Sequence, residues 1–119
     1  MDRAEVLREF LTRLRERSRS VPVIVEGRRD EALLRRFGIK NLYTLGGRSY
    51  ADLLEELPEE VTEVVLLTDA DKQGEKTFKN LKRFLEGQGI TVDGSFRDYL
   101  KRLGVEEVEN LLEVLRPNY

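Results

Sequence analysis

Two short apolar runs, about forty residues apart, each end in acidic residues that are followed by a glycine. The first run is Val23–Val25 with Glu26 and Gly27, and the second is Val64–Thr68 with Asp69, Asp71 and Gly74. Short β-branched runs of this kind are typical of buried parallel strands that enter loops. Such strands alternate with amphipathic segments along the chain. This pattern predicts an α/β fold with about four mostly parallel strands and helices on both faces.

The two acidic ends are expected to meet in space. In open α/β sheets, ligand sites gather outside the carboxyl ends of the strands, so Glu26, Asp69 and Asp71 are predicted to share one edge of the sheet. Three carboxylates at one edge repel each other unless they are protonated or bridged by a cation. Ligands that are all oxygen favour a hard ion such as Mg²⁺, and such sites usually handle phosphates. The sequence therefore predicts a magnesium site.

The length and composition limit the class of protein. A chain of 119 residues fits a single domain over 1–119 with one core, and its 37% of charged residues indicates a soluble globular protein. It contains no cysteine and no histidine, which excludes disulfides, an ordinary zinc site, a histidine base and a cysteine nucleophile. No apolar run is long enough to span a bilayer, so we expect a cytoplasmic protein without a membrane partner.

The charges are distributed unevenly along the chain. Residues 1–48 hold twelve Lys and Arg against seven Asp and Glu, whereas residues 49–119 hold nine against sixteen. A basic half beside a carboxylate cluster is suited to hold a polyanion while a metal neutralises the reacting phosphate. The alternative is that most of these charges are solvated helix faces.

Apolar periodicity and turn residues predict the individual elements. Strands are expected at 21–26, 42–44, 63–68 and 90–92, and helices at 2–18, 31–37, 49–57, 74–87, 95–103 and 105–115. Asp30 is predicted to be the N-cap of its helix, and Gly74 is predicted to begin the helix after the third strand.

The order of these motifs resembles the Toprim domain, which is shared by topoisomerases, bacterial-type primases, some nucleases and recombination proteins. The resemblance depends on Glu26-Gly27-x-x-Asp30 after one strand and Thr68-Asp69-x-Asp71-x-x-Gly74 after another. It covers residues 20–105, a Toprim core flanked by an N-terminal helix and C-terminal helices. It implies a compact, Rossmann-like Toprim fold.

Within this superfamily the chain is most similar to small stand-alone archaeal Toprim proteins of unknown function, a likeness to which residues 96–105 add. It is also similar to the catalytic half of the ribonuclease that trims 5S ribosomal RNA precursors. The chain has no separate domain with a tyrosine nucleophile and no zinc or helicase-binding module. A complete topoisomerase or a processive primase is therefore not expected.

The resemblance assigns roles to the acidic residues. Asp69 and Asp71 would bind one or two Mg²⁺ ions, for which Mn²⁺ would substitute, and Glu26 would be a metal ligand or a general acid and base. The alternative for the two aspartates is turn formation. Asp30 is expected to be an N-cap rather than a ligand.

Further candidates lie beside these motifs. Four basic residues are predicted to contact phosphates or nucleic acid, with solvated charges as the alternative: Arg28, Arg29, Arg48 and Lys72. Three glycines are predicted to shape the backbone at the site: Gly27, Gly46 and Gly74.

Two functional hypotheses from different classes remain open. The first is a Mg²⁺-dependent nuclease acting on nucleic-acid phosphodiesters, with structured RNA favoured over DNA. The second is a non-catalytic, metal-binding module that binds nucleic acid or serves as a scaffold in RNA processing or DNA repair. A protein partner that supplies substrate specificity is compatible with both hypotheses.

Overall fold

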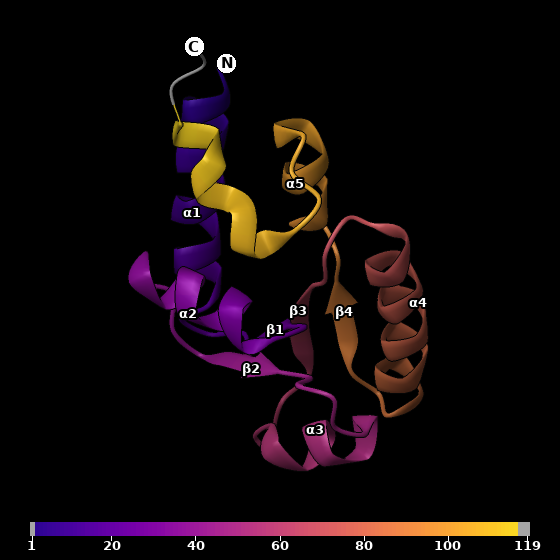
Figure 1. Cartoon of the computed structure of the whole chain (residues 1–119). Coiled ribbons are helices and arrows are strands. Elements are labelled where there is room, and N and C mark those ends of the chain that lie inside the picture. Colours follow the sequence, from indigo (N-terminus) through magenta and orange to yellow (C-terminus); the bar gives the residue numbers. More distant parts are fainter. Residues whose placement is uncertain (1, 117–119) are drawn as a thin grey trace.

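The computed structural model describes residues 2–116, in which short strands alternate with helices. The strands are β1 (Val23–Val25), β2 (Leu42–Thr44), β3 (Glu63–Leu67) and β4 (Thr91–Asp93). The helices are α1 (Arg3–Arg17), α2 (Arg28–Arg36), α3 (Tyr50–Glu56), α4 (Lys72–Gly87), α5 (Arg97–Leu103) and the 3-10 helix η1 (Val108–Leu115). Figure 1 shows the sheet between these helices. The predicted α/β fold with helices on both faces is confirmed.

The four strands form one sheet in the order β2-β1-β3-β4, and all three pairings are parallel. From β1 the chain passes first to β2 on one side and then returns to β3 on the other side. The connection therefore changes direction between β1 and β3, which is where open α/β sheets bind ligands. Val25 is paired with Leu67 in this register, so the two strands end side by side.

Alternate residues of the central strands face two separate apolar cores. Val23, Val25, Val65 and Leu67 face one core, which the buried residues of α1, α2, α5 and η1 complete. Ile24, Val64 and Leu66 face the other, together with Leu53 of α3 and with Leu81 and Leu85 of α4. The two central strands, β1 and β3, are buried on both faces, which explains why Val23–Val25 and Val64–Leu67 are continuous apolar runs rather than alternating ones.

The two predicted helix starts at the acidic motifs are wrong. The helix after β1 begins at Arg28, not after Asp30, and Gly27 is its N-cap. The Asp30 side chain instead accepts a hydrogen bond from the Gly27 N–H at 3.0 Å. The helix after β3 begins at Lys72, two residues before Gly74, because the Asp71 side chain is the cap.

The chain after β4 also differs from the prediction in detail. β4 is shifted by one residue from the predicted strand at 90–92, since Thr91 pairs with Glu63. The predicted final α-helix at 105–115 is a shorter 3-10 helix, η1, which lies beside α1 (Figure 1). Among the residues that the structure describes, no helix combines the length and the apolar character needed to cross a membrane.

Candidate active site at the carboxyl ends of β1 and β3

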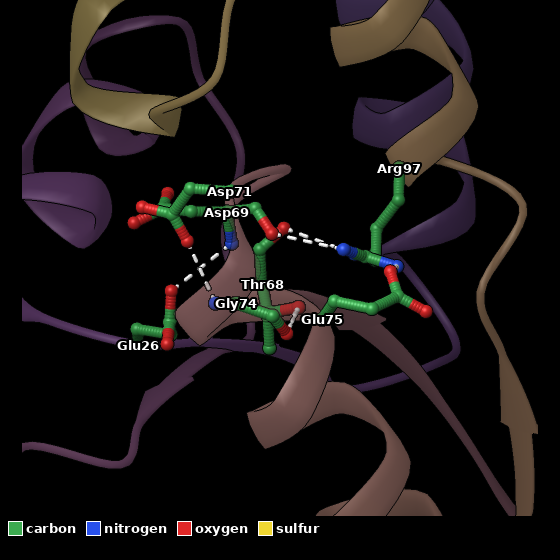
Figure 2. A network of polar contacts seen from close by, with 7 residues as sticks. All are labelled: Glu26, Thr68, Asp69, Asp71, Gly74, Glu75 and Arg97. Atoms are coloured by element: carbon green, nitrogen blue, oxygen red, sulfur yellow. Dashed lines mark hydrogen bonds and ion pairs between the residues drawn. The ribbon is translucent and has the colours of Figure 1, made fainter.

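Glu26 and Asp69 meet where the two central strands end. Glu26 follows β1 directly, and Asp69 lies two residues beyond β3. The Glu26 Oε2 atom accepts a hydrogen bond from the Asp69 N–H at 3.0 Å, as Figure 2 shows. Because adjacent parallel strands bring their carboxyl ends to one edge, residues 43 positions apart in the sequence become direct neighbours.

Asp71 caps α4 and so fixes the loop that carries both aspartates. Its Oδ1 atom accepts a hydrogen bond from the Gly74 N–H at 2.7 Å. The buried Thr68 hydroxyl donates to the Gly74 carbonyl at 2.8 Å, which closes the loop from its other end (Figure 2). A Cβ atom at position 74 would lie 2.0 Å from the Asp69 carbonyl oxygen. Only glycine permits this close approach.

Arg97 of α5 holds the same loop from the side away from Glu26 (Figure 2). Its side chain is buried, and it donates to the Thr68 carbonyl at 3.3 Å and to the Asp69 carbonyl at 2.9 Å. The guanidinium pairs with Glu75 at 2.9 Å, and its central carbon lies 4.8 Å from the centre of the Phe78 ring. Two carbonyls, a carboxylate and an aromatic face therefore satisfy a buried cation.

The first residue of η1 and the residues just before it also contact the site. The Ala70 N–H donates to the Glu106 carbonyl at 2.6 Å, and the Val108 N–H donates to the Asp69 Oδ1 atom at 2.9 Å. The Asp69 side chain is thus oriented by a backbone group that lies 39 residues further along the chain.

Two carboxyl groups at the site hold protons more tightly than usual. Burial is the largest cause that raises the pKa of Glu26 from 4.5 to about 7; the charges of Asp69 and Asp30 add to it, whereas the Asp69 N–H opposes it. Burial, followed by the charge of Asp69, raises the pKa of Asp30 from 3.8 to about 6. The cause is the crowding of partly buried acids at one edge of the sheet.

An open pocket of about 390 Å³, here called the acidic pocket, lies over this edge. Its lining contains seven of the residues that the sequence analysis proposed: Glu26, Gly27, Arg28, Arg29, Asp30, Asp69 and Asp71. Gln73 and Glu109 complete it, and neither was proposed from the sequence. The pocket therefore presents five carboxylates with two arginines at the start of α2.

Four proposed site residues lie outside this lining: Gly74, described above, and Arg48, Gly46 and Lys72. Arg48 donates to the Thr44 carbonyl at 2.5 Å and pairs with Glu56, so its contacts stabilise the end of β2. Gly46 has φ 55°, a left-handed conformation that glycine favours, in the turn after β2. Lys72 is the exposed first residue of α4. The phosphate-binding roles of Arg48 and Lys72 stay predictions.

The donor chemistry of the three central carboxylates suits a hard divalent cation. In the hydrogen bonds above, Glu26, Asp69 and Asp71 each use one carboxylate oxygen, which leaves a second oxygen for another ligand. Within residues 2–116, however, no three acidic side chains are gathered closely enough to hold an ion as they lie. Binding of an ion by all three would require these side chains to move together, and their role as ligands stays a prediction.

No sequence motif pointed to Arg97 or to the contacts near Val108. Residues 97–102 contain three basic side chains, and nothing in their spacing indicates that Arg97 is buried whereas Lys101 and Arg102 are exposed. The Val108 contact uses a backbone N–H, which no side-chain pattern reveals. A hint was available in Glu75 and Phe78, which lie three residues apart and so share a face of α4 next to the acidic loop.

Comparison with known proteins agrees with this fold. A family model of the Toprim domain matches residues 20–93, more than half of the chain. The chain therefore belongs to the Toprim domain family. Toprim domains generally bind divalent metals and are associated with work on nucleic acids. Arg97, Glu106 and Val108, which position Asp69 and its loop, lie beyond the matched residues.

Within the Toprim family, the chain is similar to individual UPF0292 proteins. A UPF0292 protein of Pyrococcus horikoshii is 35% identical over 89 residues, which are 75% of this chain and 67% of the relative. A UPF0292 protein of Pyrococcus abyssi is 36% identical over 95 residues, which are 75% and 72% of the two chains. The chain belongs with these UPF0292 proteins, as its resemblance to small archaeal Toprim proteins indicated.

A solved structure of a protein from Aquifex aeolicus is also similar. It has 36% sequence identity and a TM-score of 0.83, over 87% of this chain and 96% of that one. The architecture described above is thus shared by a protein of nearly the same extent.

Proposed function

We propose that this protein is a Mg²⁺-dependent nuclease that cleaves phosphodiester bonds in structured RNA. The observation that carries the proposal is the contact between Glu26 and Asp69 in an open acidic pocket, at the point where the sheet connection changes direction. Membership of the Toprim family supports metal-dependent work on nucleic acids. The likeness to the 5S ribosomal RNA maturation enzyme supports RNA as the substrate.

In this proposal, different residues of the acidic pocket have different roles in cleavage. Arg28 and Arg29, which line the pocket at the start of α2, would contact the phosphates on either side of the reacting one. In the metal-free protein burial raises the pKa of Glu26 to about 7, and in this proposal Glu26 would hold a proton and donate it to the leaving oxygen. A bound divalent ion would supply charge neutralisation at the attacked phosphate.

One observation favours the second hypothesis, a non-catalytic module that binds nucleic acid or serves as a scaffold. Both aspartates already accept hydrogen bonds from backbone N–H groups, Asp69 from Val108 and Asp71 from Gly74. These contacts stabilise the fold without a metal, so the acidic motif has a structural role that survives the loss of catalysis.

A cleavage assay separates the two hypotheses. The substrates are a precursor 5S ribosomal RNA, a generic structured RNA, single-stranded DNA and a supercoiled plasmid, each with Mg²⁺, Mn²⁺ or EDTA. The test variant is Asp69→Asn, which keeps an acceptor for the Val108 N–H but removes the charge. The matched control is Asp52→Asn at an exposed position of α3.

We expect metal-dependent cleavage of RNA by the wild type and by the Asp52→Asn control. Asp69→Asn is expected to lose activity by about 100-fold or more, as for removal of a group that stabilises charge in the transition state. Equal cleavage by Asp69→Asn would refute the assignment of the site. Binding of RNA without cleavage by the wild type would support the non-catalytic module.

A further inference from the structure

A second pocket, of about 380 Å³, lies at the opposite edge of the sheet from the acidic pocket. Its lining consists of residues that precede β1 and β2: Arg15, Ser18, Arg19, Gly38, Lys40 and Asn41. Three of the six are cationic and none is acidic. We call it the basic pocket. Its lining also contains no aromatic side chain.

Specific contacts build the walls of the basic pocket. The Arg15 Nε atom donates to the Phe37 carbonyl at 3.0 Å, and a Cβ atom at Gly38 would lie 3.4 Å from that nitrogen. The Asn41 side chain donates to the Ser18 carbonyl at 3.2 Å. These contacts join the end of α1 to the loop between α2 and β2, so the basic residues are held on a shaped surface.

A favourable interaction with the dipole of α1 explains only one of the three cations in the basic pocket. Arg15 lies in the last turn of α1, where a cation is favoured by the helix dipole. Arg19 and Lys40 lie outside the helices, are exposed, and make no ion pair with any carboxylate among residues 2–116. Two cations that have no carboxylate partner in one pocket favour the binding of an anion there.

Helix α2 connects the two pockets. It begins at Arg28 in the acidic pocket and ends at Arg36. The next residue, Phe37, is its C-cap and carries the carbonyl that Arg15 contacts. Its exposed positions are Arg28, Arg29, Ala32, Arg35 and Arg36, of which Arg29 pairs with Glu109 and Arg35 pairs with Glu31. At 1.5 Å per residue, α2 is about 14 Å long. Measured along the axis of a duplex, where each strand carries one phosphate per 3.4 Å, that length corresponds to about four nucleotides.

We propose that the basic pocket binds a backbone phosphate of a nucleic acid that runs along α2 from the acidic pocket. The contact is to the backbone and independent of base sequence, because the lining offers cations and amide or hydroxyl groups but no ring on which a base stacks. This inference rests on the proposed function for its substrate class. It adds an anchor about four nucleotides from the reacting phosphate.

Binding without metal tests this anchor separately from catalysis. Fluorescence anisotropy is measured in EDTA with a short fluorescein-labelled RNA duplex and with a DNA duplex of the same sequence, over a series of salt concentrations. The test variant is Arg19→Gln with Lys40→Gln, which avoids the structural contacts of Arg15. The matched control is Lys79→Gln with Arg83→Gln, two exposed cations of α4 on the other face of the sheet.

We expect the test variant to bind about tenfold more weakly, with a salt dependence shallower by about 1 because one phosphate contact is lost, while the control binds as the wild type does. Duplexes of RNA and DNA weakened alike indicate a general backbone contact, and weakening confined to one identifies the backbone that the pocket takes. Thermal unfolding of both variants verifies that they are folded.

Two results would overturn the inference. One is equal affinity of the test variant, the control and the wild type, and the other is absence of any salt-dependent binding by the wild type. The proposed nuclease activity fails by a different result, which is wild-type binding that depends on Arg19 and Lys40 but is accompanied by no cleavage under any metal.

Discussion

The guanidinium of Arg97 donates a hydrogen bond to the carbonyl of Asp69, and this links α5 to the loop that carries both aspartates. The arginine is 4% exposed, whereas its carboxylate partner Glu75 has a side chain that is 44% exposed. The two partners of this ion pair therefore differ in burial, and we expect their removal to have different costs. Removal of the arginine leaves buried carbonyls without donors, whereas removal of the Glu75 charge leaves a cation that still has two carbonyl acceptors and Phe78.

We expect Arg97→Ala to lower the free energy of unfolding by about 3 kcal/mol, because it breaks a buried, hydrogen-bonded charge. Glu75→Gln is expected to cost only about 0.5 kcal/mol, since exposed ion pairs contribute little. Urea denaturation of the two variants measures both values. Equal losses would mean that the ion pair, and not the contact with the acidic loop, is what Arg97 provides.

Gly74 allows the backbone of α4 to approach Asp69. Gly74→Ala places a methyl group against the Asp69 carbonyl, which is backbone and cannot move aside as a side chain does. We expect a loss of about 3 kcal/mol. The matched control is Gly87→Ala at the end of the same helix, where a Cβ atom meets nothing within 4 Å. That change is expected to stabilise by about 0.5 kcal/mol. Thermal unfolding that ranks the two alike would contradict this geometry.

The role of Asp71 as the N-cap of α4 can be separated experimentally from its proposed role in metal-dependent cleavage. Asp71→Asn keeps an N-cap acceptor for the Gly74 N–H, so it is expected to cost about 0.5 kcal/mol or less, whereas Asp71→Ala costs about 1 kcal/mol. Both variants remove the charge, so both are expected to lose metal-dependent cleavage.

Ser49→Ala is the control for this pair, since Ser49 caps α3 in the same way, at 3.1 Å from the Asp52 N–H. It is expected to lose similar stability and to cleave normally. Denaturation and cleavage measured on the three variants test the distinction. Cleavage by Asp71→Asn at the wild-type rate would limit Asp71 to capping.

The central part of this fold was predictable because its cause is local. The runs Val23–Val25 and Val64–Leu67, which form β1 and most of β3, are apolar throughout, as expected for strands buried on both faces. The convergence of Glu26 and Asp69 followed from parallel pairing alone. The cap of α2 was not predictable in the same way, because an acidic residue at position 30 is compatible both with an N-cap and with a group that reaches back to the Gly27 N–H.

The remaining features depend on tertiary packing. The burial of Arg97 depends on α5 meeting the loop after β3, and no pattern within residues 97–103 distinguishes it from exposed Arg102. The hydrogen bond from Val108 to Asp69 depends on how the chain returns over the sheet. Gln73 and Glu109 joined the acidic pocket for the same reason.

The acidic pocket makes the stability of the metal-free protein depend on pH. The pKa of Glu26 is about 7 in the folded protein against an ordinary 4.5, and that of Asp30 is about 6 against 3.8. The folded state therefore binds protons more tightly than the unfolded state. The associated stability is fully present below about pH 4 and is lost progressively as the pH rises to about 7.

In EDTA, the midpoint temperature of thermal unfolding is thus expected to decrease as the pH rises from 4.5 to 7.5, because these two groups ionise. Glu26→Gln keeps an acceptor for the Asp69 N–H and cannot ionise, so its midpoint is expected to fall less and to exceed that of the wild type at pH 7.5. Glu59→Gln, at an exposed position, is expected to follow the wild type. If Glu26→Gln also follows the wild type, the folded state ionises Glu26 without cost, and the proton that we assign to it for catalysis is absent.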